Sequence, residues 1–137
     1  MIYEQDLTIP ANTPESAPAT ETLFVHPGIV KRVEIFFPPG PSGLAHVRIF
    51  YMQFQLWPSN PDSSFRGDDN IISFEEDLEL KTAPFEFTLK GWNLDDTYSH
   101  TPIVRIGVIP FDRDIRKYLA NLSVGATGPK TAYSGNG

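Results

Sequence analysis

The chain has 137 residues, no cysteine, and 17 acidic against 11 basic side chains, which gives a net charge of −6. This length fits one domain with its own hydrophobic core, and the lack of cysteine excludes disulfides and thiolate metal ligands. The acidic balance argues against nucleic acid as a partner because it repels phosphate backbones, and apolar runs of only a few residues argue against a membrane-spanning helix.

Apolar and polar residues alternate along most of the chain, which is the period expected of β-strands. A first strand is predicted over residues 3–9, as an edge strand that stops at Pro10. A second is predicted over residues 20–25, and it ends at the sequence His-Pro-Gly at 26–28, which signals a turn. The third covers residues 29–37 and ends at a break rich in proline and glycine.

The longest predicted strand covers residues 46–57, and its apolar side changes partway along. Such a change is typical of a β-bulge or of a strand that crosses between sheets. Residues 58–70 are predicted as a polar loop. Three further strands are predicted over residues 72–80, 85–89 and 104–108.

These elements predict an all-β fold: a single antiparallel β-sandwich of about seven or eight strands, with jelly-roll or immunoglobulin-like topology. The order of the strands in the sheets does not follow from the pattern. We assign residues 1–110 to the sandwich and residues 111–137 to a short helix and a C-terminal arm. The helix is predicted over residues 112–122, because Ile115 and Leu119 recur there at helical spacing.

Residues 93–100 collect acids, hydroxyls and a histidine in one short segment. A metal loop or an acid–base pair is the functional interpretation of this segment. The alternative is that Asn, Asp, Thr and Ser cap a tight turn through side-chain-to-backbone hydrogen bonds. We expect the turn, because acid–base catalysis needs convergent groups, and neighbouring acids on a strand point different ways.

Other candidate sites have structural explanations as well. The three histidines, His26, His46 and His100, show no metal-ligand spacing. The oxygen-bearing residues of the 62–70 segment do not match an EF-hand, although a weak surface calcium site stays possible; they are Asp62, Asp68, Asp69 and Asn70. Arg66, Gly67 and Asp68 spell an integrin-type tripeptide, for which we expect a turn in an exposed loop.

Trp57 and Trp92 each stand at the end of a predicted strand, beside a loop. They invite comparison with the aromatic platforms on which carbohydrates stack. Tryptophan at the end of a sandwich more often closes the core, because its ring buries a large area while the indole N–H reaches a loop carbonyl. We therefore expect both rings to be packing residues.

Catalytic motifs are missing from the sequence: it has no GxSxG elbow, P-loop, GxGxxG sequence or nucleophilic cysteine. We therefore expect no enzymatic activity and predict no catalytic, cofactor-binding or metal-binding residues.

Five stretches of the sequence carry a resemblance to a known group of proteins. They are GIVKRVEI at 28–35, PPG at 38–40, GLAHV at 43–47, QLWP at 55–58, and residues 91–100, which begin GWN. With them, residues 2–110 resemble small virion proteins of tailed phages, which decorate or cement capsids or form minor structural parts. The resemblance implies a structural protein of a virus particle without a cofactor, and it assigns no functional residues.

The sequence thus predicts a non-enzymatic virion structural protein, a capsid decoration or cement protein or a minor capsid protein, that acts through subunit contacts. Its expected partners are other copies of itself, a major capsid protein, or both; nucleic acid, membranes and small-molecule ligands are not expected. Without a signal peptide, the expected location is the virion, after assembly in the host cytoplasm. The predicted assembly contacts are Ile115, Leu119 and Tyr133.

The alternative is a carbohydrate- or receptor-binding sandwich that uses Trp57, Trp92 or the loop around Arg66 and Asp68.

Overall fold

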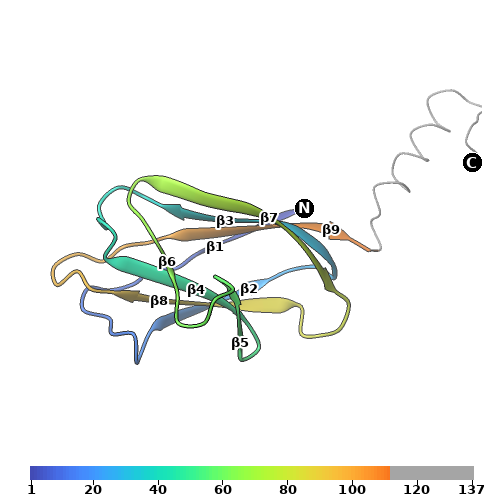
Figure 1. The fold of residues 1–137 in the computed structure, drawn as a ribbon, viewed down its shortest axis with the longest axis horizontal. Helices are drawn as coiled ribbons and strands as arrows, with labels where there is room; N and C mark the ends of the chain where they lie inside the picture. The colour runs from blue at the N-terminus through green and yellow to red at the C-terminus, as the bar shows by residue number, and fades with distance from the viewer. Residues whose placement is uncertain (112–137) are drawn as a thin grey trace, which may run out of the picture.

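A computed structural model describes residues 1–111, which fold into nine β-strands and no helix (Figure 1). The strands are β1 (Ile2–Asp6), β2 (Ala19–Phe24), β3 (Gly28–Phe37), β4 (Ala45–Tyr51), β5 (Phe54–Trp57), β6 (Phe65–Arg66), β7 (Asn70–Leu80), β8 (Glu86–Asn93) and β9 (Ile103–Pro110). The predicted helix over 112–122 lies outside the described residues, as do Ile115, Leu119 and Tyr133.

The strands form two antiparallel sheets, which lie face to face in Figure 1. One sheet has the order β1-β9-β3-β7, and the other has the order β2-β8-β4-β5, with β6 also paired to β4. The first strand therefore pairs with the last. An immunoglobulin domain places its first and last strands in different sheets, whereas a jelly roll wraps eight strands as two Greek keys. The predicted sandwich is confirmed, and its strand order is that of a jelly roll.

The prediction of one long strand over residues 46–57 is wrong, because the chain reverses within it. β4 ends at Tyr51 and β5 begins at Phe54, and Met52 between them has a φ of 56°. The apolar side changes because alternation restarts after this turn. The pairing of β4 with β5 also shifts register between Ile49 and Phe50, so an irregularity of the predicted kind accompanies the turn. The two-residue strand β6 falls inside the predicted loop 58–70.

The core lies between the sheets and consists of the inward-facing residues of alternating strands. Those of β3 and β9 are fully buried, as are those of β4 and β8 opposite them; they include Val33, Ile35, Phe37, Val104, Ile106, Val47, Ile49, Phe87 and Leu89. The outward residues of the same strands are mostly polar, which is the alternation expected of a sheet with one wet face.

The two ends of the sandwich carry different connections. At one end lie the β2–β3, β4–β5 and β7–β8 connections, and the backbone pairing there places Leu80, Gly28 and Pro110 in one row across three strands. The N-terminus lies at this end too, because the Met1 carbonyl accepts a hydrogen bond from the Val108 N–H (Figure 1). The loops between β3 and β4 and between β8 and β9 lie at the opposite end.

Candidate functional site

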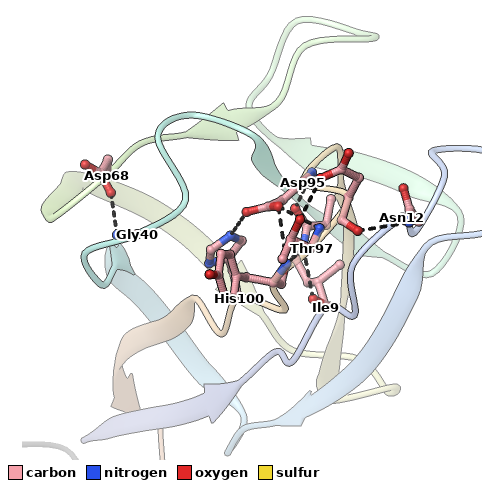
Figure 2. A network of polar contacts seen from close by, with 10 residues as sticks. Ile9, Asn12, Gly40, Asp68, Asp95, Thr97 and His100 are labelled. Atoms are coloured by element: carbon pink, nitrogen blue, oxygen red, sulfur yellow. Dashed lines mark hydrogen bonds and ion pairs between the residues drawn. The ribbon is translucent and has the colours of Figure 1, made fainter.

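An aspartate and a histidine meet in the loop between β8 and β9. Asp95 Oδ2 lies 2.8 Å from His100 Nε2, and both side chains are largely buried (Figure 2). The other carboxylate oxygen, Oδ1, accepts hydrogen bonds from the backbone N–H groups of Thr97 (2.9 Å) and Tyr98 (3.2 Å). The predicted turn-capping role is therefore confirmed. The sequence argument missed the pairing with His100, because it considered neighbouring acids, whereas these two residues meet across a turn.

Two other loops contact this pair, and a third contacts one of them. The backbones of His100 and Ile9 exchange two hydrogen bonds of 2.8 and 3.0 Å, and the Asn12 N–H donates to the Asp95 carbonyl at 2.9 Å. A Cβ built on Gly40 would lie 3.6 Å from the His100 ring, and the Gly40 N–H in turn donates to Asp68 Oδ1 at 2.7 Å (Figure 2). Among the described residues, the contacts of the pair lie within its own loop, with Asn93 at its start and with these neighbouring loops, so the geometry supports a structural role.

The hydrogen bonds to the Asp95 carboxylate make the stability of the fold depend on pH. The hydrogen bond with the His100 ring, then those from the Thr97 and Tyr98 N–H groups, lower the pKa of Asp95 below its ordinary value. A lowered pKa favours folding above the unfolded pKa of about 4, and this contribution is lost as the pH falls through the folded value. We expect Asp95→Asn to lower the thermal midpoint at pH 7 and the difference from wild type to shrink as the pH falls below about 4.

Thermal unfolding followed by circular dichroism at several pH values measures this effect. Asp96→Asn is the matched control, because among the described residues the Asp96 carboxylate accepts a hydrogen bond only from the adjacent Thr97 hydroxyl. A midpoint difference for Asp95→Asn that stays constant from pH 7 to pH 2 would contradict the prediction.

The integrin-type tripeptide is tied into the fold. Arg66 ends β6 and pairs with His46 of β4. The Asp68 carboxylate accepts a hydrogen bond from the Gly40 N–H, and the Asp68 N–H donates to Asn70 Oδ1 at 2.8 Å. Asp68 thus belongs to the turn into β7, as predicted. In residues 1–111, no group of three or more His, Asp or Glu side chains is placed to hold a metal ion.

Both tryptophans are buried, as predicted, but in different places. Trp57 is 3% exposed and belongs to the core between the sheets. Trp92 is 6% exposed but lies on the outer face of the β2-β8-β4-β5 sheet, where its ring stacks on His46 at 4.8 Å. A stacking platform needs an exposed ring, so neither indole offers one.

Basic and aromatic side chains share the outer face of β4 and β8, a cluster that sequence reasoning missed. His46, Arg48 and Phe50 alternate along β4, and Lys90 and Trp92 alternate along β8. Beside them lies a groove of about 230 Å³, which the loop before β2 borders. The sequence does show these residues at alternate positions in two segments. They could be joined into one cluster only by knowing that β4 and β8 pair.

Exposed apolar side chains gather at the end of the sandwich that holds the N-terminus. We call this surface the apolar end; among the described residues it holds seven of the eleven exposed large hydrophobic side chains, Met1, Ile2, Phe24, Met52, Phe54, Ile109 and Phe111. Ile2, Phe54 and Phe24 are 73%, 71% and 68% exposed. These seven side chains come from both sheets, and the remaining four exposed large hydrophobic side chains lie elsewhere on the described surface.

Phe111, the last described residue, donates its N–H to the Pro27 carbonyl, so the described chain stops at the apolar end. Within residues 1–111, the structure has no helix long and apolar enough to cross a membrane. No family model and no curated protein matches this sequence.

Proposed function

We propose that this chain is a non-enzymatic structural protein of a virus particle, a capsid decoration or minor capsid protein, and that it acts through contacts of its apolar end. Its partners are other copies of itself, a major capsid protein, or both. The observation that carries the proposal is the gathering of seven exposed hydrophobic side chains at one end of the sandwich. Burial of such side chains against a partner is the main favourable term in protein association.

Two further points support this proposal. Jelly-roll sandwiches are found in viral capsid proteins as well as in lectins, so the fold is compatible with the role without establishing it. The strand turn at the apolar end also presents Met52 with a positive φ, where asparagine or glycine is usual. An apolar side chain held in a disfavoured backbone conformation and exposed to water is better explained by a contact than by folding.

The carbohydrate- or receptor-binding alternative has less support from these residues. Trp57 and Trp92 are buried, and the carboxylate of Asp68 is bound by the chain itself.

The proposal predicts that polar substitutions at the apolar end abolish assembly. We expect the double variant Phe24→Ser, Phe54→Ser to remain folded, because both side chains are exposed, and to lose self-association or binding to capsids. The matched control is Leu94→Ser, Tyr98→Ser, which removes two exposed apolar side chains from the opposite end. Light scattering over a range of concentrations gives the molar mass, and co-sedimentation with capsids of the encoding virus tests attachment.

A monomeric wild-type protein that does not sediment with capsids would contradict the proposal, as would equal binding by both double variants. Capsid, portal or terminase genes beside its gene would support the viral assignment independently.

A further inference from the structure

The groove on the outer face of the β2-β8-β4-β5 sheet combines two cations with aromatic and hydroxyl groups. Its lining includes Arg48 and Phe50 of β4, Lys90 and Trp92 of β8, and Glu15 and Ser16 from the loop before β2. This loop is itself fastened, because the Asn93 N–H donates to the Thr13 carbonyl at 2.9 Å and the Ala17 N–H donates to the Pro14 carbonyl. The groove is therefore preformed, which is usual for small-molecule sites.

Arg48 is held in one position by contacts on three sides. Its Nε and Nη2 donate to the backbone carbonyls of Ser63 and Asp62, both at 2.8 Å. Its Nη1 lies 3.0 Å from Glu15 Oε2, and its guanidinium lies 4.5 Å from the centre of the Trp92 ring. A cation fixed in this way binds an anion without first losing side-chain entropy.

Lys90 is directly opposite Arg48 in the pairing of β4 with β8. Its ammonium lies 4.5 Å from the centre of the Phe50 ring, and it forms no ion pair with any residue that the structure describes. Like charges directly opposite each other on adjacent strands destabilise a sheet. Glu15 offsets the charge of Arg48 but not that of Lys90. The two cations therefore retain one unmatched positive charge, in a protein whose net charge is −6.

We propose that this groove binds an acidic monosaccharide, with the carboxylate of the ligand between Lys90 and Arg48. The carboxylate would supply the missing negative charge. A volume of about 230 Å³ is below the usual range for drug-sized ligands, so it suits a single ring. Glu15 and Ser16 line the groove and offer hydrogen bonds to ring hydroxyls.

This inference goes beyond the proposed structural role and departs from the expectation that the chain takes no small-molecule ligand. It also differs from a tryptophan platform, because the two cations bind the ligand and Trp92 serves to position Arg48.

Titration of the full chain with glucuronate at low salt, followed by calorimetry, tests the proposal. Glucose is the control for a neutral sugar of the same shape, and sodium sulfate is the control for an anion without a sugar ring. We expect saturable binding of glucuronate, none of glucose, and weaker binding of sulfate. Lys90→Gln should weaken glucuronate binding roughly tenfold or more, because it removes a charge-assisted hydrogen bond. Lys31→Gln, on the other sheet and paired with Asp77, should leave it unchanged.

A second variant tests whether Glu15 and the ligand carboxylate compete for Arg48. Glu15→Gln keeps hydrogen-bonding groups for sugar hydroxyls but removes the negative charge beside the guanidinium, so it should strengthen glucuronate binding several-fold. Equal thermal midpoints of the variants would show that each is folded. The proposal is overturned if glucuronate does not bind, if Lys90→Gln leaves its affinity unchanged, or if glucose or sulfate binds equally well. None of these results bears on assembly, which the apolar-end variants test separately.

Discussion

Replacement of Trp57 by alanine is expected to lower the free energy of unfolding by about 3–5 kcal/mol, the range for removal of a large buried aromatic side chain. The indole packs between the sheets, with ring-centre distances of 6.0 Å to Phe74 of β7 and 5.6 Å to Phe87 of β8. Its Nε1–H donates to Glu76 Oε1 at 2.6 Å. Alanine would leave a cavity at the contact between the sheets and would also remove this hydrogen bond.

Two other variants separate these contributions. Trp57→Phe keeps most of the packing and loses the hydrogen bond to Glu76, so its loss should be smaller, about 1–3 kcal/mol. Phe54→Ala removes a ring that is exposed to solvent and should change stability by no more than about 0.5 kcal/mol. Denaturation in urea measures all three values. A stability loss for Trp57→Ala as small as that for Phe54→Ala would show that the tryptophan is not part of the core.

Replacement of Asn93 by alanine is expected to lower the free energy of unfolding by about 2–4 kcal/mol, because it removes three hydrogen bonds of a buried side chain and takes from the Tyr98 carbonyl and the Asp95 N–H their partner. Asn93 is 1% exposed. Its Nδ2 donates to the carbonyls of Ile9 (3.3 Å) and Tyr98 (2.9 Å), and its Oδ1 accepts from the Asp95 N–H at 3.0 Å. One side chain thus connects the β8–β9 loop to the chain after β1.

Asn93→Asp tests whether the donated hydrogen bonds are the reason. The shape is preserved, but a carboxylate would face two carbonyl oxygens at neutral pH, so the variant should be strongly destabilised. Acid should reduce this loss relative to wild type, because a protonated carboxyl can donate one hydrogen bond again. Urea denaturation at pH 7 and pH 4 measures the change, with the exposed Asn60→Ala as control. An Asn93→Asp protein as stable as wild type at pH 7 would contradict this account.

The sequence by itself determined the fold class and most of the strands. Strict alternation in Val33, Ile35 and Phe37, or in Val104, Ile106 and Val108, is a local signal, because each strand buries one face whatever its neighbours are. The turn at Met52 was not predicted, because Met-Gln lacks the asparagine or glycine that usually marks a two-residue hairpin turn. The two residues of β6 are too few to show any period.

Only the tertiary structure decided how the strands are ordered and what their outer faces bring together. Periodicity carries no information on which strands are neighbours, so the jelly-roll order and the contact of Arg48 with Trp92 could not be predicted. The meeting of Asp95 with His100 depends on the path of one loop, which the capping hydrogen bonds of Asp95 fix. The apolar end combines residues from both termini of the described chain and from two turns, because antiparallel strands return the chain to the same end of the sandwich.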